Sequence, residues 1–167
     1  MSGSFLRRLT CAALVTAGVV AGGASAATAA DTTFDFPAGT ACQNFDLHVE
    51  ITGGNQVTKI FTAQSGNVRT LSAGTGSALT FTNLETGASL SLKAKGSVTQ
   101  IRSNADGSMT YMTSGHNVLI LFPTDFPPGP STTLTVGLTV FTVDASGVFR
   151  VLQASGNSTD LCAALSG

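Results

Sequence analysis

The residues best suited to chemistry in this 167-residue chain are its two histidines. The first, His48, lies between Asp46 and Glu50, and the alternation of polar and apolar side chains places all three on one face of a strand. Two carboxylates and an imidazole at this spacing could ligate a metal ion or move a proton. A solvated strand face with Leu47 and Val49 turned inward has the same pattern, and we favour that interpretation. No metal ion is expected.

The second histidine, His116, follows Ser114 and Gly115 in a segment that we predict to be a hairpin turn. Activation of a serine hydroxyl needs hydrogen-bond contact with the histidine and an orienting carboxylate, a geometry that two residues of one tight turn rarely meet. Residues 104–107 resemble the start of a calcium loop but lack its further ligand spacing and its closing Glu, so a plain turn is expected there. The sequence favours a protein that is not an enzyme and has no cofactor.

Residues 1–30 have the composition of a secretion signal. Two arginines precede an apolar stretch over residues 9–21, which is long enough for a signal core and too short to span a bilayer. Small residues with A-x-A spacing follow, and we expect cleavage after Ala29 or Ala30. A twin-arginine signal and a lipoprotein signal are the weaker alternatives. We therefore predict a secreted protein with one domain over residues 31–167.

Two cysteines, Cys42 and Cys162, lie near the ends of the predicted mature domain. Cysteines of an exported protein usually pair, and this bridge would close a loop of ~120 residues, worth roughly 4–5 kcal/mol in the chain-entropy model. Two free buried thiols are the alternative. The predicted pair would hold the terminal segments together.

Charge is sparse in the predicted domain, which has six basic and nine acidic residues and a net charge of −3. The basic residues form no stripe along the sequence, which argues against a nucleic acid partner. No stretch approaches ~18 unbroken apolar residues, so we expect no membrane span.

The pattern beyond residue 44 is typical of an all-β fold. Short alternating segments are separated by Gly, Asn and Asp turn signals about 8–12 residues apart, and no segment has the length and period of a crossover helix. We predict an antiparallel, hairpin-linked β-sandwich or small β-barrel with a short C-terminal helix over residues 160–165, capped by Ser158 or Thr159. The expected strands are residues 45–52, 57–64, 68–72, 78–83, 88–94, 97–103, 108–113, 117–122, 132–136, 138–143 and 147–153.

Two features stand out from the alternation. Residues 118–122 are apolar on both faces, which predicts either the most buried, central strand or a strand covered by another element. Directly after them, four prolines within eight residues exclude a sheet ladder and predict an ordered loop. Loops on β scaffolds often carry recognition, and this loop is our candidate partner site. The residues in question are Phe122, Pro123, Asp125, Phe126, Pro127, Pro128 and Pro130.

The few aromatic residues suggest packing and not a sugar-binding platform. Phe34, Phe36 and Phe126 lie outside the expected strands and are predicted to fold back on the ends of the core. Tyr111 shares a strand face with Met109, a pair that is more often part of a core than the mouth of a pocket.

Residues 115–125, together with 129–134, 158–165 and 80–87, resemble a group of uncharacterised small secreted proteins of actinobacteria. The resemblance covers most of the mature chain. It implies export from a bacterial cell, which makes the glycosylation sequon at Asn157 irrelevant, and it brings no activity or functional residue with it.

Taken together, these patterns predict a secreted, non-enzymatic β domain that binds a partner or forms part of an assembly. The partner would be an extracellular protein or a cell-wall component. One alternative is a barrel that carries a small apolar ligand. Another is an inhibitor of extracellular proteases that presents the proline-rich loop as a rigid bait.

Overall fold

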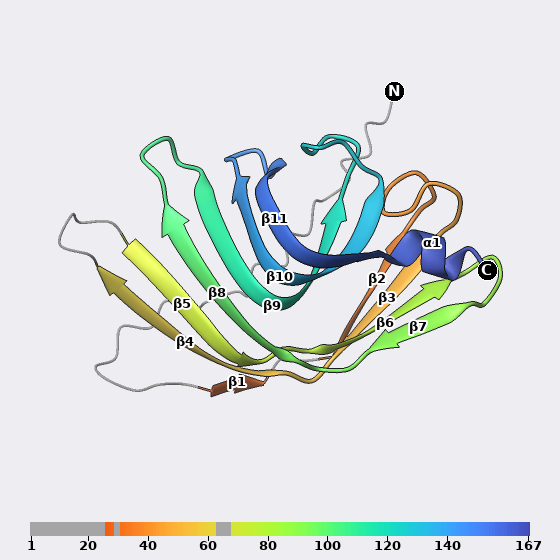
Figure 1. Ribbon diagram of the computed structural model, residues 1–167, viewed down its shortest axis with the longest axis horizontal. Coiled ribbons are helices and arrows are strands. Elements are labelled where there is room, and N and C mark those ends of the chain that lie inside the picture. The colour runs from red at the N-terminus through yellow and green to blue at the C-terminus, as the bar shows by residue number, and fades with distance from the viewer. Residues whose placement is uncertain (1–25, 29–30, 63–67) are drawn as a thin grey trace, which may run out of the picture.

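The protein forms two antiparallel sheets and one short helix (Figure 1), as seen in a computed structural model that describes residues 26–28, 31–62 and 68–167. This arrangement confirms the predicted all-β, sandwich-like fold, and the sheets do not close into a barrel. The elements are β1 (Ala26–Thr28), β2 (Thr32–Phe36), β3 (Leu47–Thr52), β4 (Asn55–Thr62), β5 (Val68–Thr75), β6 (Ala78–Asn83), β7 (Ser89–Leu92), β8 (Gly96–Ser103), β9 (Met109–Leu121), β10 (Ser131–Val143), β11 (Phe149–Asp160) and α1 (Leu161–Leu165).

The larger sheet has seven strands in the order β1-β4-β5-β8-β9-β10-β11, and the smaller has four in the order β2-β3-β6-β7. The chain passes between the sheets after β1, β3, β5 and β7, and the other consecutive strands pair as hairpins. The three residues of β1 fall within the predicted signal segment and add only to the outer side of β4. The predicted turn over residues 65–67 lies outside the described residues.

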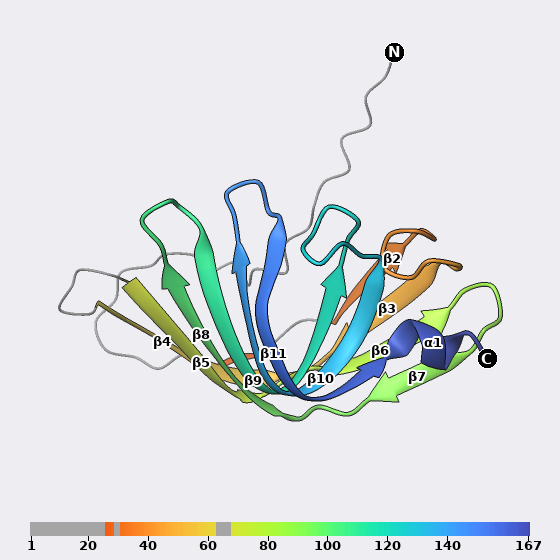
Figure 2. The same ribbon diagram turned by 45° about the horizontal axis from the view of Figure 1, so that its top comes forward.

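A row of glycines bends the larger sheet. Gly137 of β10 pairs with Gly115 of β9 on one side and with Gly156 of β11 on the other. All three have positive φ, between 101° and 155°. A Cβ added at Gly156 would lie 2.1 Å from the carbonyl oxygen of Val136, so a side chain has no room there. Glycine at such a row lets neighbouring strands kink together, and the long strands are visibly curved in Figures 1 and 2.

The predicted hairpin turn around Gly115 is therefore wrong. β9 runs without interruption through Gly115 from Met109 to Leu121, and β10 likewise runs through Gly137. A glycine with positive φ is a turn signal when it stands alone, but here the partner strands bend at the same position. Each pair of short segments that we expected in this region is thus one long strand.

The main core lies between the smaller sheet, the helix, the second half of β9 and the first half of β10. Leu47, Phe81, Leu161 and Leu165 are 0–1% exposed and form its centre. The half-buried side chains of β9 and β10 that pack against this centre are Val118, Ile120 and Leu134. The prediction of a most buried, central strand over residues 118–122 is wrong, because β8 pairs with β9 only as far as Gly115 and residues 118–121 pair with β10 alone. The alternative, a segment covered by another element, is confirmed, since Val118 and Ile120 pack against the core.

On the other face of the bent sheet, the first half of β9 supports a short aromatic stack. Tyr111 and Phe141 are direct cross-strand partners with ring centroids 4.9 Å apart, and Phe141 stacks on Phe149 at 5.4 Å. Burial raises the pKa of the Tyr111 phenol. Thr139 and Val143 of the same face of β10 are buried. The rings therefore act as packing groups on the inner side of the bend, with Met109 on the same face as Tyr111.

Two local predictions need correction. Phe34 and Phe36 were expected outside the strands, but they belong to β2, which pairs with β3 along its whole length. The C-terminal helix exists, but its N-cap is Asp160, whose carboxylate accepts from Ala163 N at 3.0 Å. Ser158 and Thr159, the predicted caps, are still paired in β11. The strand ladder thus continues up to the first helical residue.

Candidate functional site

The predicted partner loop between β9 and β10 is held by one buried carboxylate. Asp125 is 1% exposed. Its Oδ2 accepts a hydrogen bond from Phe122 N at 2.6 Å, and its Oδ1 accepts from Phe149 N at 3.0 Å. Hydrogen bonds to a carboxylate are charge-assisted and roughly twice as strong as neutral ones. Asp125 therefore ties the start of the loop to the first residue of β11.

The loop also pairs with β11 through its main chain. Phe126 N donates to Phe149 O at 2.8 Å, and Val151 N donates to Phe126 O at 2.7 Å. Phe126 thereby forms a parallel bridge with Arg150, which lies between these two residues of β11. Because β11 is an edge strand, its outer N–H and C=O groups would otherwise be free to pair with another chain. The loop covers the first part of that edge.

The side chain of Phe126 projects outward and is 46% exposed. The guanidinium carbon of Arg150 lies 4.1 Å from its ring centroid, a cation–π contact worth about 0.5–1 kcal/mol at an exposed site. Pro127 and Pro128 follow it and are exposed as well. We call Phe126, Pro127 and Pro128 the loop tip. It is a small apolar surface on a segment that is anchored at two points.

The structure separates the remaining residues of the predicted site. Phe122 is half-buried, and its ring lies 5.9 Å from that of Phe36, between centroids. Asp125 is turned inward, so neither of these residues is presented to a partner. Pro123 is exposed, but it lies at the start of the loop, before the buried Asp125. Pro130 is half-buried at the far end of the loop. The loop tip is what remains for direct contact.

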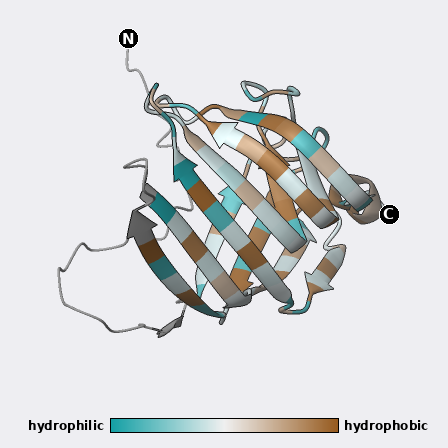
Figure 3. Cartoon of the chain, turned by 60° about the vertical axis from the view of Figure 1, so that its left-hand side comes forward, coloured by the Kyte–Doolittle hydropathy of each residue, from teal (hydrophilic) through white to brown (hydrophobic). Residues whose placement is uncertain are grey.

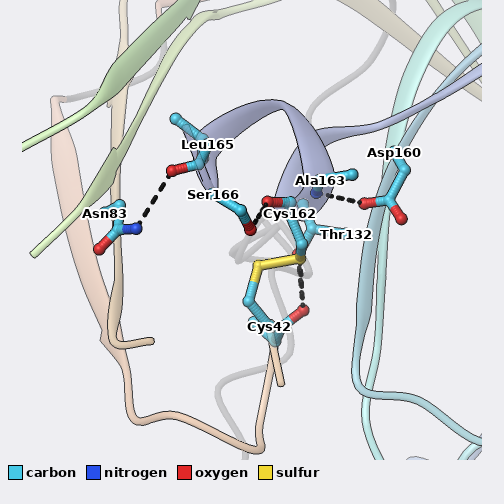
Figure 4. The surroundings of a disulfide bond; sticks show 9 residues. Cys42, Asn83, Thr132, Asp160, Cys162, Ala163, Leu165 and Ser166 are labelled. Carbon is cyan, nitrogen blue, oxygen red and sulfur yellow. Dashed lines mark hydrogen bonds between the residues drawn. A yellow bond between two sulfur atoms is a disulfide. The ribbon is translucent and has the colours of Figure 1, made fainter. Parts of the chain in front are cut away.

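Cys42 and Cys162 form a disulfide, as predicted, with their Cα atoms 5.5 Å apart and a sequence separation of 120. Figure 4 shows how α1 carries Cys162 against the segment that holds Cys42. Around the bridge, Thr132 Oγ1 donates to Ala41 O at 3.0 Å and the Asn83 amide donates to the last helical carbonyl at 3.1 Å. The Cys162 sulfur, which carries no proton in a disulfide, contacts Ala41 O at 3.3 Å. The bridge and its neighbours fasten the helix to both sheets.

A depression of about 310 Å³ lies beside the disulfide. It is open to solvent, and its lining is mixed, with Gln43, Asn44, Phe45, Pro130, Ser131 and Asp160 among the contributing residues. The Asp160 carboxylate is already used as the helix cap. The depression therefore presents polar groups to solvent, but its one carboxylate is already engaged in the helix cap.

The two histidines do not assemble the constellations considered above. His48 Nδ1 lies 2.6 Å from Asp35 Oδ1, across the β2–β3 pair, on an exposed face of the smaller sheet. Asp46 is engaged elsewhere, since its Oδ1 accepts from Ala38 N at 2.7 Å. His116 is exposed on β9 and directly opposite Val136. Among the described residues, no three His, Cys, Asp or Glu side chains gather as metal ligands.

Three residues of these contacts could not be identified from the sequence, because each contact depends on which segments pair and in what register. Asp35 becomes the partner of His48 because β2 pairs with β3. Phe149 N donates to Asp125, and the Arg150 guanidinium covers the Phe126 ring, because the loop returns to the start of β11. The Thr-Thr-Phe-Asp-Phe alternation of β2 was the available signal for the first of them.

Comparison of the chain with protein-family models, with curated proteins and with solved structures gives no significant match. The resemblance to secreted actinobacterial proteins stays a prediction. In the part of the chain that the structure describes, no helix has the length and apolar character needed to cross a membrane.

Proposed function

We propose that this protein is a secreted, non-catalytic recognition domain that contacts an extracellular protein or a cell-wall component through the loop tip. The observation that carries the proposal is the way the tip is held. A buried carboxylate and two main-chain hydrogen bonds fix Phe126 at the edge of the sheet while its ring stays 46% exposed. A pre-ordered loop loses little conformational entropy on binding, which favours recognition by such a segment.

Secretion is part of this proposal. A signal-like segment over residues 1–30 and a disulfide between Cys42 and Cys162 both support it, because disulfides persist in oxidising compartments. A β domain closed by a bridge near both ends is suited to an environment without chaperones or reducing agents.

The alternative functions find less support in the geometry. A carrier of an apolar ligand needs an enclosed apolar cavity, whereas the depression beside the disulfide is open and partly polar. A protease inhibitor needs an extended bait segment. In this loop Asp125 N and Gly129 N both donate to Phe122 O at 2.9 Å, which keeps the chain folded back on itself.

Capture experiments with matched variants test the proposal. The mature domain, Phe126→Ala and Leu84→Ala are immobilised and exposed to culture medium and cell-wall extracts. Leu84 is the control because it is 52% exposed and lies in the turn between β6 and β7, away from the loop. A partner bound by the loop tip is retained by the parent and by Leu84→Ala and loses at least ~30-fold in affinity with Phe126→Ala, the effect of a binding hot spot of about 2 kcal/mol. Equal retention by all three proteins would reject the loop tip as the site.

A further inference from the structure

Four of the six basic residues in the described part of the chain lie on one face of the larger sheet. Arg69 of β5 is the direct cross-strand partner of Arg102 of β8. The pairing continues from Arg102 through Thr110 and Thr142 to Arg150 of β11, so the three arginines share one row and one face. Lys59 of β4 pairs with Leu71, two residues along from Arg69, and lies on the same face. We call Lys59, Arg69, Arg102 and Arg150 the cationic face.

This arrangement is not balanced by acids. All nine acidic residues of the chain fall within described segments, and none lies in β4, β5, β8, β9 or β10. The two nearest in sequence, Asp106 and Asp144, are in the hairpin turns and accept hydrogen bonds from Ser108 and Ser146 of their own turns. Among the described residues, the one ion pair is between His48 and Asp35, on the smaller sheet.

The pairing of Arg69 with Arg102 works against stability. Like charges directly opposite each other on adjacent strands are destabilising, and neither has an ion-pair partner in the described part of the chain. The Arg69 Nε is buried and finds no hydrogen-bond partner among the described residues. A fold that breaks a local rule without a compensating contact usually does so at a functional surface.

Apolar side chains share the same face. Val57 pairs through Ala73 with Val98, in the row next to that of Lys59 along the strands, and these two valines are 37% and 43% exposed. Met112 of β9 is directly opposite Gln100 and is 36% exposed. Figure 3 turns this side of the molecule toward the reader and shows hydrophobic and hydrophilic residues alternating along the strands. The face therefore mixes positive charge with apolar tips.

We propose that the cationic face binds the surface of an anionic lipid bilayer. The arginines and Lys59 would contact headgroup phosphates, to which a guanidinium can donate two parallel hydrogen bonds. Val57, Val98 and Met112 would rest at the boundary between headgroups and acyl chains. The charges span five strand spacings, from β4 to β11, which is about 24 Å and wide enough to cover several lipid headgroups.

A lipid surface fits this face better than a soluble polyanion does. A polyanion needs only charge and is served best by a groove that follows its backbone. Here the apolar side chains lie among the cations on the outer side of a bent sheet, and the smaller sheet packs on that same side of β9 and β10 farther along. Apolar tips beside cations match the headgroup boundary, where both kinds of group are satisfied. The cationic face shares one residue with the surroundings of the loop tip, since the Arg150 guanidinium also contacts the Phe126 ring. The other three cations and the apolar side chains carry the inference without the loop tip and its protein or cell-wall partner.

Co-sedimentation of the mature protein with lipid vesicles tests this proposal. The vesicles are made from neutral phosphatidylcholine or from the same lipid with about one third phosphatidylglycerol, at low salt. The test variant is Lys59→Gln with Arg102→Gln, since both residues are exposed. The matched control is Lys93→Gln with Lys95→Gln, which removes the same charge from outside the cationic face. A second pair, Arg69→Gln with Arg150→Gln, examines the rest of the face.

Each cation near an anionic surface contributes about fivefold to binding, so each face variant should bind about 25-fold more weakly than the parent while the control keeps most of its binding. Binding should also weaken as salt shortens the screening length from about 10 Å at 0.1 M to about 3 Å at 1 M. Equal binding to neutral vesicles, or equal losses in the face and control variants, would overturn the proposal. Soluble polyphosphate that displaces the protein completely, with the apolar variant Val98→Ser binding vesicles as the parent does, would assign the face to a polyanion instead.

Discussion

Substitution of Gly156 by alanine should destabilise the domain severely, because the bend of the larger sheet leaves no space for a side chain at this point. The new Cβ would lie 2.1 Å from Val136 O and 3.0 Å from the Cα of Gly137, and both are main-chain atoms that cannot rotate away. The φ of 103° adds strain of about 1–2 kcal/mol for a residue with a Cβ. Overpacking adds about 1–3 kcal/mol. The expected loss in the free energy of unfolding is therefore about 2–5 kcal/mol, a large part of the ~5–15 kcal/mol typical of a domain.

Equilibrium unfolding in urea with the disulfide intact measures this loss. Gly107→Ala is the matched control, since Gly107 has a positive φ of 80° but nothing within 4 Å of the added Cβ. The control should lose only the backbone strain, so Gly156→Ala should exceed it by at least ~1 kcal/mol. Equal losses in the two variants would show that the close approach of β10 and β11 at the glycine row does not exist, and the reasoning about the bend would fail.

Three further changes probe the loop, the bridge and a turn. Asp125→Asn leaves one of the two main-chain donors without an acceptor in a buried position, and urea unfolding should show a loss of about 1.5–3 kcal/mol; a loss below ~0.5 kcal/mol would contradict the anchoring role. Replacing Cys42 and Cys162 together by serine should lower the free energy of unfolding by about 4–5 kcal/mol, measured in the same way, and an unchanged urea midpoint would speak against the bridge. The Ser146 hydroxyl, followed by the main-chain amides of its turn, holds the pKa of Asp144 below its ordinary value of 3.8, so the stability it contributes is complete above that value and is lost as the pH falls below it. The acid unfolding curve of Asp144→Asn, followed by circular dichroism, should therefore be less steep than that of the parent. Identical acid unfolding curves would refute this contribution.

The fold class and the disulfide could be predicted because they depend on local patterns. Alternation of polar and apolar side chains identifies half-buried strands residue by residue, and export makes pairing of two remaining cysteines the default. Apolar residues on both faces of the segment over residues 118–122 also indicated that other elements cover it, but not that it pairs with β10 alone. These inferences need no knowledge of which strand lies beside which.

The bend could not be predicted, because a glycine in the sequence alone does not distinguish a turn from a kink inside a long strand. Gly115 alone indicates a turn, and the sequence around it offers no other reading. Only the register, which places Gly115 opposite Gly137 and Gly137 opposite Gly156, shows that three strands kink together. The same limit applies to the expected short strands on either side of these glycines.

The distribution of charge on the surface also depends on strand register and could not be predicted. Counted along the chain, six cations spread over the predicted domain form no stripe. In the sheet, Arg69 and Arg102 become direct neighbours, and Arg150 joins their row three strands farther on. The role of Asp125 was hidden for the same reason, since its second partner, Phe149, is reached only when the loop folds back on β11. Composition can exclude a run of charge in sequence but not a patch of charge in space.

The most direct test of the loop anchor, from which the loop tip takes its role, is amide hydrogen exchange measured by NMR at two positions. Phe126 N and Val151 N donate the two hydrogen bonds that fasten the loop to β11, at 2.8 Å and 2.7 Å. Both amides should exchange at least ~100-fold more slowly than the same residues in an unstructured peptide, which corresponds to an opening free energy of about 2.7 kcal/mol or more. Exchange of both amides at the unstructured rate, in a domain whose β9 and β10 amides are protected, would show that the loop is not anchored and would contradict the account.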